Sequence, residues 1–401
     1  MTRFLSAKLD VVQASPTIAI TRQAADLRRQ GHDVIGLSHG EPDFPTPPHV
    51  NAAAKAAIDG GATKYTDVDG TPELKRAVVE KFRRENSLAY DVSQISVSAG
   101  GKQVIFNALF ASINPGDEVI IPAPYWVSYP DMVCLAGGVP VILECGEEQA
   151  FKLRAPQLRA AITPRTKWLV LNSPCNPTGS AYAAAELRGL ADVLLEYPQV
   201  YVMADDIYEH VGFGGWEFAT IAAVEPLLFD RVLTCNGVSK AFAMTGWRIG
   251  YAGGPVQLIR AMGTIQSQST TNPSSISQAA AVAALSGPMD FLQERNATLK
   301  ERRDLAIELL CRVPGISCRV PEGAFYLFPS CKGLIGRRTP GGRVLQSDAD
   351  VATFFLEQAL VAVVPGSAFG MSPYFRISFA IATERLRTAC TRIAEACGKL
   401  V

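Results

Sequence analysis

The 401-residue sequence has few charged residues, and their signs cancel. Asp, Glu, Lys and Arg make up 19% of the chain, below the level of about 25% that is usual for a soluble domain. Because 38 basic residues balance 38 acidic ones, the formal net charge is zero, which argues against a nucleic acid or another polyanion as a partner. The low charged share favours a large core or a surface that is buried between subunits.

Signals for membranes and secretion are also missing. No uncharged apolar run approaches the roughly 20 residues that cross a bilayer, and the N-terminal MTRFLSAKLD lacks the apolar core of a signal peptide. The nine cysteines are scattered from Cys134 to Cys397 without a C-x-x-C pair, so free thiols in a reducing compartment are favoured over a disulfide framework. We therefore expect a cytoplasmic protein without a membrane anchor.

Several well-known catalytic motifs are absent. The chain contains neither G-x-G-x-x-G nor H-E-x-x-H, and we predict no metal site. The segment GVSKA misses the nucleophile elbow G-x-S-x-G because its last residue is Ala241. The segment SVSAGGKQ is no Walker loop, because Gln103 stands where a Ser or Thr is required. A P-loop nucleotide binder is therefore disfavoured.

What is present in the middle of the chain is an alternation of short apolar segments with helix-like segments such as Lys102–Ile113 and Ala183–Glu196. The strand-like segments are Ile95–Ser98, Glu118–Pro122, Lys167–Asn172, Val200–Ala204 and Arg231–Cys235. This alternation predicts an α/β fold with a mostly parallel sheet that helices cover on both faces. Ligands of such sheets bind at the carboxyl ends of the strands.

The two ends of the chain have a different pattern. The predicted elements there are a helix over residues 17–30, a strand at Val34–Ser38, a helix at Ala349–Ala359, a strand at Tyr374–Phe379 and a last helix from Thr383. In the last helix, Leu386, Ala389, Ile393 and Cys397 share one face. We expect a large domain at about residues 48–290 and a small α+β domain formed by residues 1–47 and 291–401.

The most informative segment is NGVSKAFAMTGWRIGY, Asn236–Tyr251. Lys240 lies in apolar surroundings, and desolvation lowers the pKa of a lysine toward the neutral amine that Schiff-base chemistry needs. Arg248 follows in a tight Gly-Trp-Arg turn, and its planar fork suits a phosphate. Taken singly, an exposed lysine and a structural arginine are the simpler interpretation.

Three further segments carry polar residues near predicted strand ends. In YVMADDIYE a strand ends at Asp205, with Tyr208 three residues later, and such a carboxylate pairs well with a protonated ring nitrogen. NSPCNPTG forms an irregular loop around Asn176. In SVSAGGKQVIFN a strand is followed by Gly101 and Lys102 at a helix start, where backbone N–H groups bind phosphate. The simpler alternatives are an acidic turn, a plain turn and an ordinary helix start.

Together these segments resemble the class I aminotransferases that depend on pyridoxal 5'-phosphate (PLP), and SKAFAMTGWR is the longest match. The resemblance implies the fold type I of PLP-dependent transferases, with PLP held by Lys240 as a Schiff base. It also implies cofactor contacts from other residues, which are Gly101, Lys102, Trp126, Asn176, Asp205, Tyr208, Arg248 and Tyr65. Among these, Asp205 would pair with the pyridine nitrogen, Trp126 would stack on the ring, and Tyr65 would reach the phosphate in the neighbouring subunit.

The resemblance also implies a substrate site. Gly40, in GEPDFPTP, and Arg376, in YFRISFA, would bind the substrate α-carboxylate, with Trp126 and Asn176 beside them. Lys102, Ser15 and Thr17 are candidates for the distal carboxylate. Taken alone, Arg376 would more simply be an ion-paired strand residue.

The resemblance extends from about residue 10 to residue 395 and is greatest to the bacterial aspartate aminotransferase group, whose members often also accept prephenate or glutamate. It implies transamination of L-aspartate with 2-oxoglutarate, giving oxaloacetate and L-glutamate, in a homodimer with shared active sites. In the enzymes that act on both aspartate and prephenate, a lysine is expected just before the Ser-x-Thr of the N-terminal arm. Gln13 stands there in this chain, which argues against prephenate.

Other functions remain open at this point. An aromatic or alanine aminotransferase, or a carbon–sulfur lyase, would have the same fold. A non-catalytic ligand-sensing module is a different class of alternative. Such modules carry an additional DNA-binding domain, for which we expect no room and find no basic patch.

Overall fold

The computed structural model describes residues 4–12 and 16–401, and for residues 16–18 it describes the backbone alone. The largest sheet has seven strands in the order β2-β8-β7-β6-β5-β3-β4. These strands are β2 (Ile95–Ser98), β3 (Glu118–Ala123), β4 (Val139–Glu144), β5 (Thr166–Asn172), β6 (Tyr201–Asp205), β7 (Val232–Gly237) and β8 (Gly250–Gly253). Only β8 is antiparallel to its neighbours, so the prediction of a mostly parallel sheet is confirmed.

Alternate residues of the strands face opposite sides of this sheet. In β3, Val119 and Ile121 belong to one buried cluster and Ile120 to another. The first cluster includes side chains of α4 (Gly101–Ser112), α5 (Ser128–Ala136) and α9 (Val256–Ser267). The second includes side chains of α3 (Pro72–Asn86), α7 (Ala184–Glu196) and α10 (Ser275–Ser286). Helices therefore cover both faces, as the apolar strands predicted.

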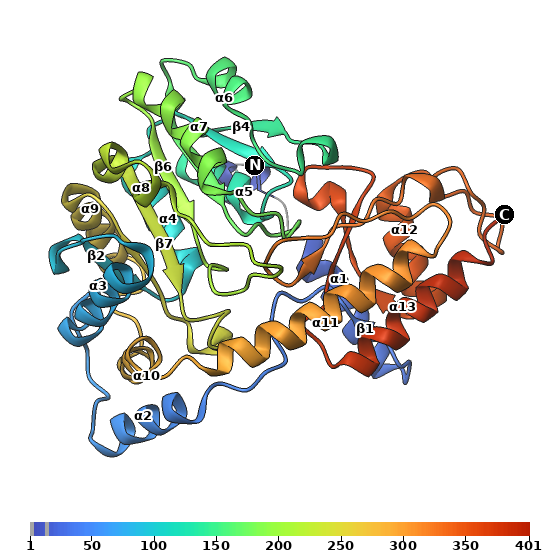
Figure 1. Ribbon diagram of the computed structural model, residues 1–401, viewed down its shortest axis with the longest axis horizontal. Helices are drawn as coiled ribbons and strands as arrows, with labels where there is room; N and C mark the ends of the chain where they lie inside the picture. The colour runs from blue at the N-terminus through green and yellow to red at the C-terminus, as the bar shows by residue number, and fades with distance from the viewer. Residues whose placement is uncertain (1–3, 13–15) are drawn as a thin grey trace.

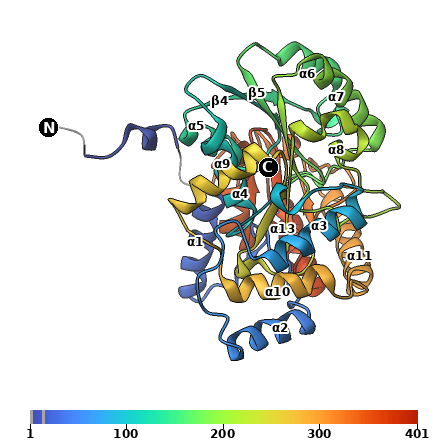
Figure 2. The same cartoon turned by 90° about the vertical axis from the view of Figure 1, so that its left-hand side faces the viewer.

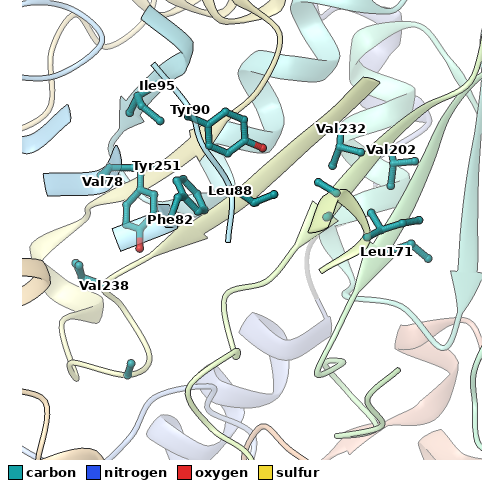
Figure 3. Close-up of a cluster of buried hydrophobic side chains, with 14 of the residues drawn as sticks. Val78, Phe82, Leu88, Tyr90, Ile95, Leu171, Val202, Val232, Val238 and Tyr251 are labelled. Atoms are coloured by element: carbon teal, nitrogen blue, oxygen red, sulfur yellow. The ribbon is translucent and has the colours of Figure 1, made fainter. Parts of the chain in front are cut away.

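Aromatic rings fill part of the second cluster. The Phe82 ring lies 5.2 Å from that of Tyr90 and 5.7 Å from that of Tyr251, both edge to face (Figure 3). All three side chains are buried. This packing holds α3 against β8, the strand that runs next to β2.

Segments from both chain ends form a second group of elements. In Figure 1, the blue α1 and β1 lie near the red α13, and the long α11 extends from the neighbourhood of α10 to α13. Here β11, β12 and β9 form an antiparallel sheet, and β1 pairs with β10 in parallel. The strands are β1 (Ile35–Gly36), β9 (Tyr326–Leu327), β10 (Val361–Ala362), β11 (Val364–Pro365) and β12 (Phe375–Ser378). The helices are α1 (Pro16–Arg29), α11 (Phe291–Cys311), α12 (Asp348–Phe354) and α13 (Thr383–Cys397).

The remaining helices are α2 (Pro48–Asp59), α6 (Ala155–Ala161) and α8 (Ile221–Val224). The domain boundaries near residues 48 and 290 stay a prediction. Residues 4–12 lie at the side of the molecule in Figure 2, where Lys8 Nζ donates to the carbonyl of Leu135 in α5 over 3.0 Å. Within the described part of the chain, every helix is too short or too polar to cross a membrane.

Several boundaries differ from those expected. The strand expected at Val34–Ser38 is only two residues long, because only Ile35 and Gly36 pair with β10. The helix expected at Ala349–Ala359 continues beyond α12 as a π-helix, Phe355–Ala359. By contrast, the buried face predicted for the last helix is confirmed: Leu386, Ala389, Ile393 and Cys397 are all buried.

Candidate active site

One pocket of about 360 Å³ lies where the strands of the large sheet end. Asn172 ends β5, Asp205 ends β6, and Lys240 follows β7 closely. The second group of elements closes the pocket with Tyr326 of β9 and Arg376 of β12. Most of the predicted site residues line it, namely Gly40, Gly101, Lys102, Trp126, Asn176, Asp205, Tyr208, Lys240, Arg248 and Arg376.

The amine of Lys240 is held by the other end of the chain. Its Nζ donates a hydrogen bond to the backbone carbonyl of Gly40 over 2.7 Å. Burial lowers the pKa of Lys240 to about 8, and the positive charge of Arg376 acts in the same direction. The Lys240 amine is therefore poised near neutral pH between its charged and its nucleophilic form.

Gly40 is held in place because its loop is fixed against the loop that carries Lys240. The Thr46 hydroxyl donates to the carbonyl of Ala243 over 2.9 Å and accepts from Trp247 Nε1 over 3.1 Å. The Thr245 hydroxyl bonds to the Glu41 carboxylate. These contacts explain why two segments about 200 positions apart meet at one side chain.

Asp205 brings a buried carboxylate to the floor of the pocket. Burial raises the pKa of Asp205 to about 6, although the Tyr129 hydroxyl donates to Oδ2 and opposes this shift. The side-chain amide of Asn172 donates to the Asp205 carbonyl over 2.8 Å, while Asn172 Oδ1 accepts from the backbone N–H of Asn176. Because burial destabilises the ionised carboxylate of Asp205, a positively charged ligand group beside Oδ1 or Oδ2 would be favoured.

The neighbouring acid, Asp206, is not part of the pocket lining. Its carboxyl is buried, and burial holds the pKa of Asp206 well above the usual range. Its Oδ2 has no hydrogen-bond partner among the described residues. A neutral carboxylic acid fits the surroundings of Asp206. Of the two acids, only Asp205 lines the pocket and could contact a ligand there.

The start of α4 offers hydrogen-bond donors to the pocket. Helix starts leave backbone N–H groups unsatisfied, and Gly101 opens this helix on the pocket side. Arg248 lies beside it, and its guanidinium donates to the carbonyls of Thr245 and Ala99 over 3.0 and 3.2 Å. The position between the helix start and Arg248 requires a glycine. Gly100 has a φ of +99°, and a Cβ there would lie 2.2 Å from Arg248 Nη2.

Lys102 and Trp126 both line the pocket and contact each other. Lys102 Nζ lies 5.0 Å from the centre of the Trp126 ring, within the range of a cation–π contact. Burial, followed by the charge of Arg248, lowers the pKa of Lys102. Lys102 thus adds a basic side chain to the pocket besides Lys240, Arg248 and Arg376.

Arg376, a buried residue of β12, also lines the pocket. Nη1 donates to Asn176 Oδ1 over 2.9 Å, and Nη2 donates to the Ser38 carbonyl over 2.5 Å. Nε is buried and has no partner among the described residues. The guanidinium also stacks over the rings of Tyr326 and Phe369, at 4.7 and 4.9 Å. A buried arginine with a free N–H is suited to an anionic ligand such as a carboxylate.

Three predicted residues are not gathered here. Tyr65 is 89% exposed and lines a separate hollow with Thr66 and Ser275. Ser15 lies outside the described residues, as does Gln13, and of Thr17 only the backbone in α1 is described. The roles assigned to these residues stay predictions.

Some residues in or next to the pocket were not singled out by the sequence. Ser239 lines the pocket next to Lys240, and its place in the strongest motif was a usable signal. Tyr129 is not part of the lining, but it follows Trp126 at helical spacing and its hydroxyl reaches Asp205. Tyr326 gave no signal, because the run FYLF has the pattern of an ordinary buried strand. Its hydroxyl lies 2.7 Å from that of Tyr208.

Comparisons with known proteins agree with this geometry. A family model described as aminotransferase class I and II matches residues 32–393. An aspartate/prephenate aminotransferase of Cereibacter sphaeroides is 59% identical over 99% of both chains. An aspartate aminotransferase of Rhizobium meliloti is 55% identical over 98% of this chain and 96% of its own.

Solved structures match over the same length. The crystal structure of the aspartate aminotransferase from Rhizobium meliloti has a TM-score of 0.97 at 54% identity, and each chain is covered completely, at 100%. An aspartate aminotransferase from Thermus thermophilus, solved with maleate, has a TM-score of 0.92 at 43% identity over 98% of this chain and 100% of its own. The similarity thus includes both groups of elements that enclose the pocket.

Proposed function

Because the chain belongs to the aminotransferase class I and II family, we propose that it is a PLP-dependent enzyme that transfers the amino group of L-aspartate to 2-oxoglutarate. The products are oxaloacetate and L-glutamate. The main support is that Arg376, from the second group of elements, lines one pocket with Lys240 and Asp205 of the large sheet. Relatives that are 55% and 59% identical are named for aspartate.

The donor set of the pocket fits PLP at both ends. Gly101 and Arg248 offer backbone and guanidinium N–H groups for its phosphate. At the other end, the buried Asp205 carboxylate would pair with a protonated pyridine nitrogen, and Trp126 offers a ring for stacking. Tyr208 and Asn176 are the proposed partners of the ring oxygen. When bound, PLP supplies a carbonyl that captures the amino group and a ring that stores the electron pair released at the substrate Cα.

Lys240 is the proposed catalytic residue. The Lys240 amine would bind the cofactor in the resting enzyme, and this bond requires a neutral amine. Burial lowers the pKa of Lys240 to about 8 and so favours the neutral form. Once the amino acid has released it, the same amine would act as the general base that moves the proton from the substrate Cα to the cofactor carbon. The Gly40 carbonyl, 2.7 Å away here, is an acceptor for the free amine.

Arg376 orients the substrate. Its free Nε–H, with the guanidinium nitrogen atoms that already contact Asn176 and Ser38, would hold the α-carboxylate, assisted by the Gly40 backbone. Fixing the carboxylate in this way turns the Cα–H bond toward Lys240. The distal carboxylate needs another partner, for which Lys102, Ser15 and Thr17 are proposed. The Thermus relative was solved with maleate, a four-carbon dicarboxylate like aspartate.

The active form is proposed to be a homodimer with shared sites. Tyr65 is exposed and lies outside the pocket of its own chain. A tyrosine that contacts the phosphate of a neighbouring subunit would have these properties. A cytoplasmic location is proposed as well, because the nine cysteines are free, as is usual in reducing compartments.

Prephenate is a second candidate amino acceptor. It is favoured by the name of the Cereibacter relative, aspartate/prephenate aminotransferase. It is opposed by Gln13, where we expect a lysine in enzymes of that kind. Assaying prephenate with the wild type and with Gln13→Lys separates the two possibilities. A wild-type kcat/KM for prephenate similar to that for 2-oxoglutarate would show that Gln13 does not exclude this acceptor.

The test of the main function is a product assay. The purified protein, loaded with PLP, is incubated with L-aspartate and 2-oxoglutarate, and oxaloacetate and glutamate are measured. We expect ping-pong kinetics and a visible absorbance band that changes on addition of aspartate alone. In Lys240→Ala the turnover should fall by about 10²–10⁴-fold or more, because the general base is lost. Near-normal turnover in that variant would show that the cofactor is assigned to the wrong lysine.

A further inference from the structure

Tyr326 contacts three proposed functional groups at once. It lies in β9, is 1% exposed and lines the pocket. Its hydroxyl is 2.7 Å from that of Tyr208, and its ring lies 4.7 Å from the centre of the Arg376 guanidinium. The hydroxyl also approaches Gly40 so closely that a Cβ there would be 2.5 Å from it. No other residue type fits at position 40 without moving Tyr326.

The direction of the hydrogen bond between the two phenols matters. Each phenol has a single proton to donate, and one of the two protons occupies the space between the oxygens. If Tyr208 donates to Tyr326, the Tyr208 oxygen has no proton left for the pocket. If Tyr326 donates, the Tyr208 proton is free to point toward a ligand, and the accepted bond polarises it into a stronger donor.

We propose that Tyr326 is a positioning residue, whose hydroxyl donates to Tyr208 and thereby directs the Tyr208 proton into the pocket. This rests on the proposed function, in which Tyr208 donates to the ring oxygen of PLP. The Tyr326 ring has a separate effect, because it stacks on Arg376 and keeps the guanidinium oriented. One side chain thus links the cofactor side of the pocket with the carboxylate side.

The two parts of Tyr326 are separable by mutation. Tyr326→Phe keeps the ring on Arg376 and removes only the hydroxyl. A matched control is Tyr90→Phe, since the buried Tyr90 hydroxyl bonds to Thr234 over 2.9 Å and Tyr90 does not line the pocket. Both variants lose one buried hydroxyl contact of similar length, so a general loss of stability affects them alike.

The experiment measures the visible absorbance of the PLP-loaded protein against pH. A weaker donor at Tyr208 stabilises negative charge on the ring oxygen less. The pH at the midpoint of the absorbance change should therefore be about 0.5–1 pH unit higher in Tyr326→Phe than in the wild type. Tyr90→Phe should leave it unchanged. In a Tyr208→Phe background, Tyr326→Phe should cause no further shift, because its effect passes through Tyr208. For aspartate, kcat should fall by about 3–10-fold, while KM stays within about twofold because the ring still stacks on Arg376.

Equal midpoints in wild type and Tyr326→Phe would overturn the proposal, as would an undiminished shift in the Tyr208→Phe background. So would a Tyr326→Phe protein that fails to bind PLP while Tyr90→Phe binds it, because the hydroxyl would then be needed for binding itself. A wild type that binds PLP but does not act on aspartate contradicts the proposed substrate alone. A wild type without any visible band contradicts both proposals.

Discussion

The side-chain amine of Lys240 donates a hydrogen bond to the backbone carbonyl of Gly40, over 2.7 Å and 200 positions of the chain. This bond joins the loop after β7 to the loop after β1, so the amine lies between the large sheet and the smaller group of strands. Burial at this place is also the main cause of the lowered pKa of Lys240. The position and the pKa of this amine therefore depend on both halves of the pocket.

The first prediction concerns the pH dependence of that amine in protein without PLP. A lysine is neutral above its pKa, and the pKa of Lys240 is lowered to about 8, so the reactive form should increase through pH 8 and level off above it. The rate of reconstitution with PLP, followed by the growth of the visible band, should rise with the same midpoint. Lys240→Ala supplies the background rate. A midpoint near 10, as for an exposed lysine with a pKa of about 10.4, would contradict the effect of burial.

The second prediction separates the adjacent acids. Asp205→Ala should lower kcat by about 10–10³-fold, because an opposite charge beside a protonated nitrogen is worth 1–3 pKa units. PLP binding should suffer less, since the phosphate contacts remain. Asp206→Asn, at the acid outside the pocket, should keep kcat within a few-fold of wild type. The opposite ranking of these variants would mean that Asp206, not Asp205, faces the cofactor.

The third prediction concerns Arg376. Lysine keeps the charge but loses the planar fork, and a hydrogen bond to a charged group contributes about 1.5–3 kcal/mol, so Arg376→Lys should lower kcat/KM for aspartate by about 10–10²-fold. Arg385→Lys is the control, because Arg385 is exposed and pairs with Asp33. Steady-state kinetics with aspartate measures both. An unchanged kcat/KM in Arg376→Lys would refute its role as the carboxylate partner.

The fourth prediction tests shared sites. If Tyr65 acts in the neighbouring subunit, Tyr65→Ala and Lys240→Ala proteins, each poorly active alone, should complement when mixed. The hybrid dimer would have one site with both defects and one with neither, so each hybrid dimer should recover up to about half the activity of a wild-type dimer. Conditions that exchange subunits are verified first with tagged wild-type protein. No recovery under those conditions would place Tyr65 in its own subunit or outside the mechanism.

The fifth prediction concerns stability away from the pocket. Glu85, Glu209 and His210 lie close enough together to hold a metal ion, but the buried Lys81 ammonium already pairs with Glu209 and lies 3.6 Å from Glu85. Burial raises the pKa of Glu209, and the Lys81 charge outweighs this and leaves it below the usual value. Without Lys81, the buried carboxylate of Glu209 loses the cation that it pairs with. Lys81→Met should therefore lower the free energy of unfolding by about 3–5 kcal/mol.

The control for Lys81 is an exposed pair. Lys300→Met breaks the contact with Asp304 at the surface and should cost no more than about 1 kcal/mol. Urea denaturation gives both values. The double variant Lys81→Met/Glu209→Gln should be less destabilised than Lys81→Met alone, because no unpaired charge is left in the core. If the two single variants lose equal stability, the Lys81 pair is no more important than a surface contact.

The sequence by itself determined those features that depend on neighbours along the chain. The apolar runs around Ile120, Leu169 and Val202 specify buried parallel strands, because such segments leave no polar face for water. Turn residues and strand ends placed Asn176, Asp205 and Lys240 at one edge of the sheet, since parallel strands end on the same side. Strands with weak local signals were not predicted: β8 is rich in glycine, and β4 is a partly exposed edge strand.

Only the tertiary structure decided which residues from distant segments meet. The contact between Arg376 and Asn176 joins positions 200 apart, and that between Tyr208 and Tyr326 joins positions 118 apart. The local sequences around Tyr326 and Arg376 do not indicate which residues these side chains contact, because both lie in short strands with ordinary buried patterns. Their surroundings arise when the chain ends pack against the large sheet, and the lowered pKa of Lys240 arises from the same burial. Desolvation is a property of everything that surrounds a group in space. The apolar neighbours of Lys240 in the sequence therefore favour a lowered pKa, but the contacts that complete its burial are not encoded in any local stretch of the sequence.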